Sequence, residues 1–349
     1  MTAARLVARC VRGLEPLLAA EILELGLGPV TRLGHREVHF RTARPAARAA
    51  RLRTADDVFL HVARAPDPGP GRAAAGGLAR LAEAAAPPLL GRRPGGPGTG
   101  IEVSASFLGR RAFNRYDAED AVGTALARRL GLPYHPRRGG HPPPPGYGGW
   151  RLTLDGEHAT LLLRLAERPL HRRPYRARTV RGALHPPVAA AMARLAGVSA
   201  GHRVLDPCCG AGTLLVEAAL TEPQARYEGC DLAPEALRAA RANAAGCRAV
   251  RFRRADAGEL PLPRHSADRV LCNPPWGGQV DPRGLLARGP ARWWAELRRV
   301  LVPGGTAVVL LPDADGLTGA LGHGLSPSHL QQLRVSGAQP YLVRLRAPG

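Results

Sequence analysis

The chain contains no lysine, few aromatic residues and no long apolar run. All 49 basic residues are arginine, and aromatic residues make up 4% of the 349 positions. No window approaches the ~20 consecutive apolar residues of a membrane-spanning helix, and charged residues interrupt positions 1–27, as a signal peptide would not allow. The sequence therefore indicates neither a membrane protein nor a secreted one, and we expect a cytoplasmic location.

The cysteines lack the spacing of a metal site or a disulfide framework. No Cys-x-x-Cys pair occurs among Cys10, Cys208, Cys209, Cys230, Cys247 and Cys272. Such pairs mark zinc and redox sites, whereas disulfide frameworks are typical of small secreted chains. We expect no metal, and small buried thiols at these positions.

The excess of arginine favours a polyanionic partner. The formal net charge is +21, and residues 1–180 hold 29 arginines against 15 acidic residues, whereas residues 181–349 hold 20 against 13. Guanidinium groups bind phosphates bidentately, so the first half is the better candidate for a nucleic-acid-binding region. The arginines expected to contact the nucleic acid are Arg110, Arg111, Arg137, Arg138, Arg172, Arg173 and Arg176.

The tetrapeptide Asn273-Pro274-Pro275-Trp276 follows the apolar run 269–272. Each proline lacks a backbone donor and fixes its own φ, so the chain must leave the strand in a stiff turn. The Asn273 amide oxygen and the Pro274 carbonyl are free acceptors that can hold an exocyclic amine. The flat face of Trp276 can stack the ring that carries this amine.

Three more predicted strands lead to a carboxylate. Residues 202–206 end at Asp206, before a glycine-bearing turn and a predicted helix, and strands 227–230 and 249–254 lead to Asp231 and Asp256. Ligands of open α/β sheets bind at the carboxyl ends of the strands. Asp231 suits the carboxylate that binds ribose hydroxyls, and Asp256 could accept from an adenine amine. Leu215 replaces the third glycine of a dinucleotide fingerprint, which disfavours a pyrophosphate cofactor.

The run 204–276 resembles the S-adenosylmethionine-dependent methyltransferases that act on amino groups. Their signatures are an Asp-Pro-x-x-Gly-x-Gly loop, here residues 206–212, and an Asn-Pro-Pro-aromatic tetrapeptide. The resemblance implies a Rossmann-like sheet and the catalytic residues Asn273, Pro274, Pro275 and Trp276. It also implies that S-adenosylmethionine is bound by Asp206, Pro207, Gly210, Gly212, Thr213, Asp231, Leu232, Asp256, Ala257 and Asn273.

The N-terminal half is expected to contain two α+β modules. Strands at 6–11 and 58–63, helices at 13–25 and 46–53 and a hairpin over 30–41 predict a ferredoxin-like unit. A strand at 101–107, a helix at 118–130 and a strand pair over 150–165 predict a second unit, with disordered loops at 84–100 and 139–149. The runs 12–15 and 170–176 resemble the ferredoxin-like and THUMP modules that precede the catalytic domain of RNA guanine-N2 methyltransferases.

The predicted architecture is thus an α/β Rossmann-like methyltransferase sheet preceded by ferredoxin-like and THUMP-like α+β modules. The boundaries are 1–65 for the ferredoxin-like module, 66–178 for the THUMP-like module and 179–349 for the methyltransferase domain. The sheet should close with an antiparallel pair at 330–335 and 341–346. The resemblance implies methylation of the N2 amine of a guanine in structured RNA, either tRNA or large-subunit rRNA. We expect the protein to be a monomer.

Three other functions stay open at this point. The same tetrapeptide occurs in DNA adenine-N6 methyltransferases and in methyltransferases of protein glutamine, so the chemistry does not separate these nitrogens. The basic first half argues against a protein substrate. A non-catalytic RNA-binding or assembly factor would also retain the fold, although Asp206, Asp231 and Asn273 are all intact.

Overall fold

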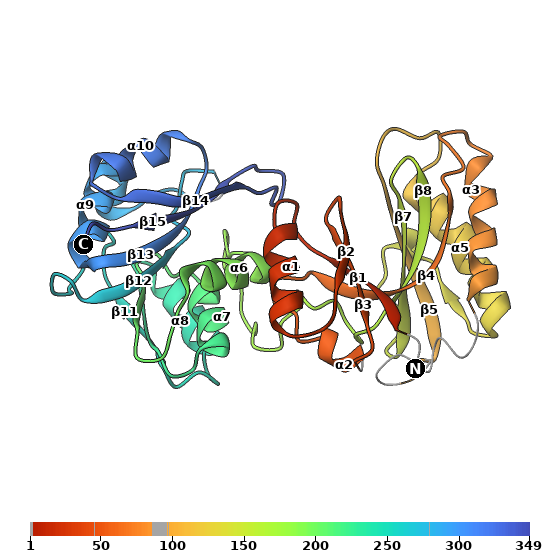
Figure 1. Cartoon of the computed structure of the whole chain (residues 1–349), viewed down its shortest axis with the longest axis horizontal. Helices are drawn as coiled ribbons and strands as arrows, with labels where there is room; N and C mark the ends of the chain where they lie inside the picture. The colour runs from red at the N-terminus through yellow and green to blue at the C-terminus, as the bar shows by residue number, and fades with distance from the viewer. Residues whose placement is uncertain (1–2, 45, 86–95, 97, 279) are drawn as a thin grey trace. The chain divides into compact units, whose positions relative to one another are not determined.

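The computed structural model describes residues 3–44, 46–85, 96, 98–278 and 280–349. The chain forms two compact units (Figure 1), of which the first comprises Met1–Cys10 and Leu18–Leu170 and the second Val11–Leu17 and His171–Gly349. Each unit is built around one β-sheet.

The first sheet has eight strands in the order β2-β3-β1-β4-β8-β7-β5-β6. The strands are β1 (Ala4–Arg9), β2 (Val30–Gly34), β3 (Glu37–Thr42), β4 (Asp57–Pro66), β5 (Gly100–Phe107), β6 (Tyr134–His135), β7 (Tyr147–Leu154) and β8 (His158–Arg164). The helices of this part of the chain are α1 (Glu15–Glu24), α2 (Ala46–Ala49), α3 (Ala74–Gly77) and α5 (Arg115–Leu130), with 3-10 helices η1 (Leu78–Ala84) and η2 (Arg137–Gly139). Strand β4 pairs antiparallel with both β1 and β8, so the two expected modules share one sheet.

The observed boundaries of the modules and loops differ from the predicted ones. The boundary predicted at 65/66 falls at the last residue of β4, and the two compact units separate at 170/171, not at 178/179. The expected loop over 139–149 is shorter than predicted, because β7 begins at Tyr147. Most of the other expected loop, residues 86–95 and 97, lies outside the described residues.

Local hydrogen bonds explain where two helices differ from prediction. Helix α5 begins at Arg115 instead of residue 118, because the Asn114 side chain accepts from the N–H groups of Tyr116 and Asp117 in a capping box. The helix predicted over 46–53 ends at Ala49. Buried Glu21 accepts from the N–H groups of Arg53 and Thr54 at 2.9 Å each, which draws that segment out of the helix.

The second sheet has the strand order β11-β10-β9-β12-β13-β15-β14. Its strands are β9 (Arg203–Asp206), β10 (Arg226–Asp231), β11 (Val250–Arg254), β12 (Ala267–Cys272), β13 (Leu301–Leu311), β14 (Ser326–Gln332) and β15 (Tyr341–Arg346). Its helices are α6 (Pro186–Ala196), α7 (Thr213–Thr221), α8 (Pro234–Asn243), α9 (Ala291–Val300) and α10 (Asp315–Gly322), with the 3-10 helix η3 (Gly284–Arg288). The parallel strands confirm the Rossmann-like prediction. The closing antiparallel pair is also present, although its first strand is Ser326–Gln332 and not 330–335 as predicted.

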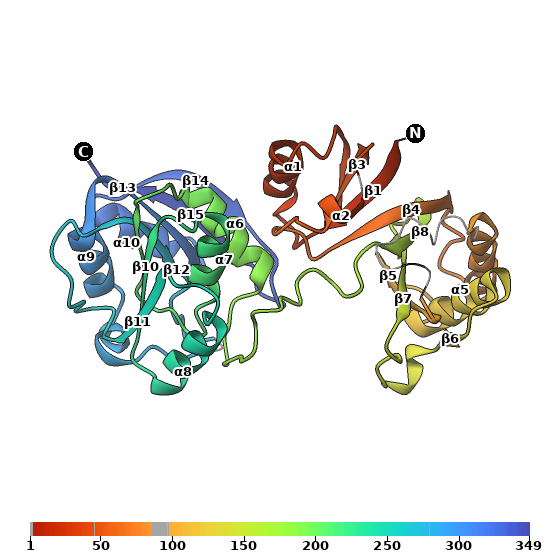
Figure 2. The same ribbon diagram turned by 90° about the horizontal axis from the view of Figure 1, so that it is seen from below.

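The second sheet is covered on both faces (Figure 2). Helices α6 and α7 pack together on one side, and α9 and α10 lie on the other. Trp293, Trp294 and Leu297 of α9 are buried against Val270 and Val309 of the sheet. Burial on both faces explains why β12 and β13 carry continuous apolar runs instead of alternating ones.

Arg111 was expected to contact RNA, and the structure corrects this prediction. Its side chain is 4% exposed, and its guanidinium donates to both carboxylate oxygens of Asp67, which is 3% exposed, at 2.8 and 2.5 Å. It also donates to the Gly69 carbonyl at 3.0 Å. These hydrogen bonds hold the pKa of Asp67 below its usual value. The ion pair fixes the segment that follows β4, and the Arg111 guanidinium is therefore not available to bind a phosphate.

Replacing Arg111 with alanine should therefore destabilise the first unit. Removal of one partner of a buried ion pair leaves the other carboxylate uncompensated, which costs about 3 to 5 kcal/mol of unfolding free energy. The matched control is the exposed neighbour Arg110→Ala, which should change the unfolding free energy by no more than about 0.5 kcal/mol. Urea unfolding followed by circular dichroism measures both, and equal stabilities for the two variants would contradict a structural role for Arg111.

Candidate functional site at the carboxyl edge of the second sheet

Parallel pairing brings the predicted site residues to one edge of the second sheet. Strand β9 pairs with β10 on one side and with β12 on the other. Because all three run in the same direction, the ends of these adjacent strands bring together Asp206 and Asp231, which are the last residues of β9 and β10, and Asn273, which follows β12. The chain order reverses between β9 and β12, and this switch point is where open α/β sheets bind ligands.

A cavity of about 1170 Å³ opens at this edge. Most of the predicted site residues line it, namely Asp206, Pro207, Gly210, Thr213, Asp231, Leu232, Ala257, Asn273, Pro274, Pro275 and Trp276. The structure therefore brings together residues from four separate segments of the sequence.

Asp231 joins two turns of the cavity wall. One of its carboxylate oxygens accepts from the Gly210 N–H at 2.9 Å, and the other accepts from the Ala233 N–H at 2.8 Å. A carboxylate oxygen can accept a further hydrogen bond, so Asp231 retains capacity for hydroxyl donors of a ligand.

Asp206 is only 1% exposed and has one backbone partner, the Cys208 N–H at 3.1 Å. Burial raises the pKa of Asp206 well above its usual value, and the nearby Asp231 carboxylate raises it further. A cationic ligand in the cavity would oppose both effects, because it favours the ionised carboxylate.

Two residues predicted to contact the ligand have structural roles in the fold, and their ligand contacts stay predictions. Gly212 is absent from the cavity wall, and a Cβ atom there would lie 3.0 Å from Phe252 and 3.2 Å from Ala240, so this glycine permits close packing. Asp256 does not line the cavity either. Its two oxygens accept from the N–H groups of Gly258 and Leu285 at 2.9 Å each, so its carboxylate fixes the local backbone and, like that of Asp231, keeps capacity for a further donor.

The tetrapeptide is fixed by its tryptophan. The indole N–H of Trp276 donates to the Leu310 carbonyl at 3.0 Å, and its ring meets Trp293 edge to face with centroids 5.8 Å apart. Asn273 is half-buried, and its side-chain amide has no hydrogen-bond partner among the described residues. The amide is thus available to a ligand while the turn that carries it is held in place.

Not all the arginines predicted to contact RNA are free to do so. Arg173 is buried and donates through Nε to Glu217 at 2.9 Å, so its RNA contact is a wrong prediction for the same reason as that of Arg111. Arg138 is half exposed and pairs with Asp117 and Asp120. The other four have exposed or half-exposed side chains and stay predictions, namely Arg110, Arg137, Arg172 and Arg176.

Several residues of the cavity wall were not among the predicted catalytic, cofactor-binding or RNA-binding residues. They are Arg178, Arg181, Arg238 and Arg283, together with Val335, Ser336, Ala338 and Pro340 from the turn between β14 and β15. The dense arginine run before α6 was a signal for the first two. The others come from a helix and from loops that only the fold brings to the cavity, so no local pattern marks them.

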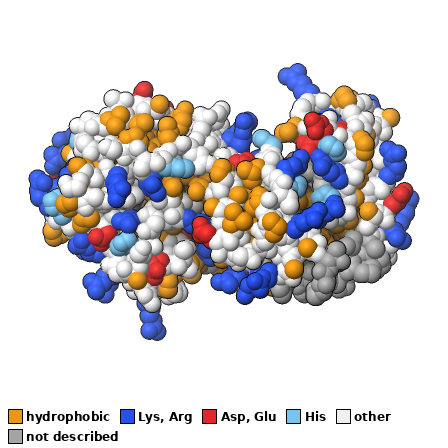
Figure 3. Space-filling view, viewed as in Figure 1, with side chains coloured by type: hydrophobic (Ala, Val, Ile, Leu, Met, Phe, Trp, Pro, Cys, Tyr) orange, Lys and Arg blue, Asp and Glu red, His pale blue; other side chains and the backbone are white. Residues whose placement is uncertain are grey.

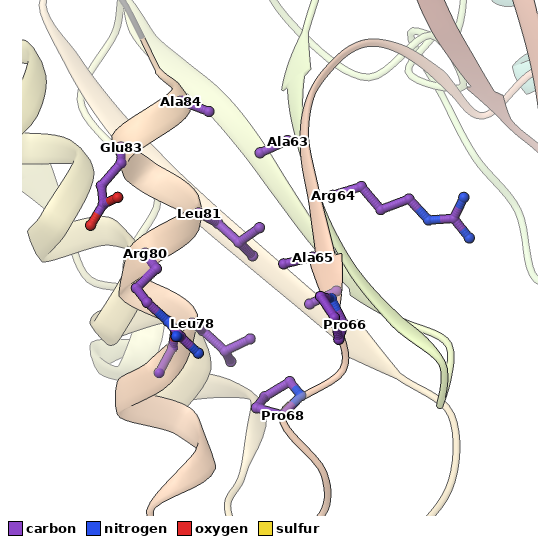
Figure 4. A pocket seen from close by; sticks show the side chains of 12 residues that line it. Ala63, Arg64, Ala65, Pro66, Pro68, Leu78, Arg80, Leu81, Glu83 and Ala84 are labelled. Atoms are coloured by element: carbon purple, nitrogen blue, oxygen red, sulfur yellow. The ribbon is translucent and has the colours of Figure 1, made fainter.

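The first unit has a separate cavity of about 440 Å³ between β4 and η1. Figure 4 shows Ala63, Ala65, Leu78 and Leu81 facing one another across it, while the Arg64 side chain points away. The wall is mainly alanine, leucine and proline, so it offers apolar surface instead of the acceptors found at the edge of the second sheet.

The residues of the larger cavity fit S-adenosylmethionine. Its positive sulfonium and ammonium groups suit the two carboxylates, and Asp231 suits ribose hydroxyls. The Thr213 hydroxyl, 3% exposed, is buried at the cavity wall without a hydrogen-bond partner among the described residues. Within that part of the chain, no helix is both long and apolar enough to cross a membrane, and no three acidic, histidine or cysteine side chains form a metal site.

Comparison with known proteins extends over both units. The family described as RMKL-like, methyltransferase domain, matches residues 173–335, and the RlmL ferredoxin-like domain matches residues 5–59. The chain is 35% identical over 340 residues to the tRNA (guanine(6)-N2)-methyltransferase of Thermus thermophilus, a match that covers 94% of this chain and 95% of that protein. It is 30% identical to the ribosomal RNA large subunit methyltransferase K/L of Alcanivorax borkumensis, over 88% of this chain and 48% of that protein.

A solved structure also matches nearly the whole chain. The crystal structure of TrmN from Thermus thermophilus matches with a TM-score of 0.78 and 33% sequence identity, covering 98% of this chain and 99% of that one.

The raised pKa of Asp206 predicts a pH dependence of stability. The unfolded chain loses this proton near pH ~4, whereas the folded chain keeps it to higher pH. The stabilisation is therefore complete below the unfolded pKa and is lost as pH rises through the folded pKa. Urea unfolding without cofactor, between about pH 5 and about pH 8, should show stability falling more steeply for the wild type than for Asp206→Asn. Parallel profiles would contradict a buried protonated Asp206.

Proposed function

Because the chain belongs to the THUMP-containing RNA guanine-N2 methyltransferase family, we propose that its substrate is tRNA, with the exocyclic N2 amine of one guanine as methyl acceptor. The match to the tRNA enzyme of Thermus thermophilus spans nearly the whole of both chains, which favours tRNA over large-subunit rRNA. The observation that carries the proposed chemistry is the free amide of Asn273 beside Asp206 and Asp231 at one sheet edge.

The chain supplies binding and orientation in this proposal. S-adenosylmethionine supplies an electrophilic methyl group, and Asp231, Asp206 and the Gly210 turn would hold it. The Asn273 amide oxygen and the Pro274 carbonyl accept the two hydrogens of the guanine amine. This contact turns the nitrogen lone pair out of conjugation and towards the methyl group, a positioning effect of about 7 to 11 kcal/mol at best.

Trp276 receives the guanine ring. The target base must leave its stack to enter the cavity, which costs a few kcal/mol, and stacking on an aromatic face recovers about 1 to 3 kcal/mol. The hydrogen bond to Leu310 and the contact with Trp293 fix the indole plane before the base arrives, so little side-chain entropy is lost on binding.

We further propose that the exposed arginines of the first 180 residues bind phosphates of the RNA, and that the protein acts as a cytoplasmic monomer without a metal. Arg110 and Arg172 are the clearest candidates, since both are exposed and neither forms an ion pair with a described residue. Arg137 and Arg138 would have to exchange carboxylate partners for phosphate.

Labelled methyl transfer separates this function from its alternatives. Bulk tRNA, bulk rRNA, DNA and protein from cells that lack the enzyme are incubated with purified protein and labelled S-adenosylmethionine, followed by nucleoside analysis. We expect N2-methylguanosine in tRNA. A transcript with inosine at the modified position lacks the N2 amine and should accept no methyl. Label in N6-methyladenine, in protein or in no substrate would overturn the proposal.

Replacing Asn273 with alanine should slow methyl transfer without weakening binding. Loss of one preorganised polar contact of this kind typically costs about 100- to 1000-fold in rate. Single-turnover transfer into tRNA at saturating S-adenosylmethionine measures this step, and dissociation constants for both ligands should stay near those of the wild type.

The matched control is Gln224→Ala, which removes an exposed amide outside the cavity. It should transfer methyl at the wild-type rate. An Asn273→Ala enzyme that works within a few-fold of the control would show that the tetrapeptide is only a structural turn.

A further inference from the structure

The segment that precedes α6 is fixed although it has no regular secondary structure. Residues 171–185, called the strap here, contain neither helix nor strand. Glu217 of α7 is fully buried and accepts from Arg173 Nε at 2.9 Å and from the Tyr175 hydroxyl at 2.8 Å. Two hydrogen bonds to one buried carboxylate therefore anchor the first part of the strap.

Asn243 anchors the second part. This side chain, at the end of α8, is 2% exposed. Its amide oxygen accepts from the Arg178 N–H at 2.9 Å, and its amide nitrogen donates to the carbonyls of Arg178 and Ala211 at 2.9 Å each. A single amide thus ties the strap to the glycine turn of the cofactor cavity.

The strap also meets the loop that follows the tetrapeptide. Gly182 has φ +74°, and a Cβ atom at this position would lie 2.6 Å from Cγ2 of Val280. Only glycine fits both the left-handed backbone and the close approach. Two walls of the cavity therefore touch here, one ending in Arg181 and the other leading to Arg283.

Arginines line the cavity on both walls. Arginine side chains are spread over the visible surface (Figure 3), so exposure alone does not distinguish the arginines at the cavity from the others. Arg178 and Arg181 of the strap, Arg238 of α8 and Arg283 are exposed and line it. Glu235 and Asp281 also line the cavity, but none of the four guanidinium groups forms an ion pair with a described carboxylate.

These four unpaired arginines carry more positive charge than the cofactor could pair with. S-adenosylmethionine has one carboxylate, whereas a nucleotide presented to Asn273 has a phosphate on each side. We propose that Arg178, Arg181, Arg238 and Arg283 form a rim that binds the RNA backbone on both sides of the target nucleotide. The rim belongs to the catalytic unit itself, and this inference rests on the proposed function.

The rim is tested by variants that remove the positive charge but keep a polar side chain. Arg178→Gln with Arg181→Gln, and Arg238→Gln with Arg283→Gln, are compared with a control pair, Arg251→Gln with Arg264→Gln. Both control arginines are exposed and lie outside the cavity wall. The probe is bulk tRNA from cells that lack the enzyme, titrated against each protein at several salt concentrations.

Each rim variant should flatten the log–log salt dependence of tRNA binding by about 0.7 to 0.9 per lost phosphate contact. The dissociation constant for S-adenosylmethionine, measured by calorimetry, should change in at most one of the two rim variants, because the cofactor has a single carboxylate, and retained binding also shows that a variant is folded. The control pair should keep the wild-type slope.

Three results would contradict the proposal that the rim binds the RNA backbone. They are an unchanged salt slope in both rim variants, an equal flattening in the control pair, or a loss confined to S-adenosylmethionine binding. Methyl transfer by the wild type tests the proposed function separately. If the wild type binds tRNA through the rim but transfers no methyl to it, the proposed function alone is refuted. If the wild type methylates tRNA but the rim variants keep the wild-type salt slope, the proposed role of the rim alone is refuted.

Discussion

Parallel pairing of β9 with β10 and β12 is the constraint on which the site depends. Asp206, Asp231 and Asn273 are far apart in the sequence, and only the common direction of their strands brings them to one edge. The same geometry places the glycine turn before α7, so that Gly210 donates to Asp231. The site is therefore as rigid as the sheet, because both faces of the sheet are covered by helices and its apolar strands cannot shift register without exposing the core.

The buried polar residues decide which arginines are available to RNA. Asp67 engages Arg111, Glu217 engages Arg173, and Asp57 engages Arg164 at 2.6 Å. Each of these arginines counts fully toward the net charge of +21, yet none presents a free guanidinium. Net charge correctly indicates the class of partner but not the surface that meets it. That surface is set by the tertiary contacts that leave some arginines, such as Arg178 and Arg181, without a carboxylate partner among the described residues.

Much of the second unit could be predicted from sequence, because its signals are local. Short apolar runs mark the strands, glycines mark the turn after Asp206, and two prolines mark the turn at Asn273. The failures concern partners distant in sequence. Arg111 and Asp67 lie 44 positions apart, and so do Arg173 and Glu217. Asp256 follows a strand as expected, and its carboxylate also accepts from the N–H of Leu285, a contact that no pattern near Asp256 could indicate. The shared N-terminal sheet was missed for the same reason, since β4 and β8 pair across about a hundred residues of sequence.

The double pairing of β4 limits how this protein can be divided. A chain that started at residue 66 would lack β1, β2, β3 and nearly all of β4, and β8 would become an open edge of apolar residues such as Leu161 and Leu163. Exposed edge strands of this kind pair with other chains and aggregate. The ferredoxin-like segment is thus not a detachable addition to a THUMP-like module. Insertions and domain exchanges between relatives should be tolerated at its loops, whereas a break inside the shared sheet should not survive selection.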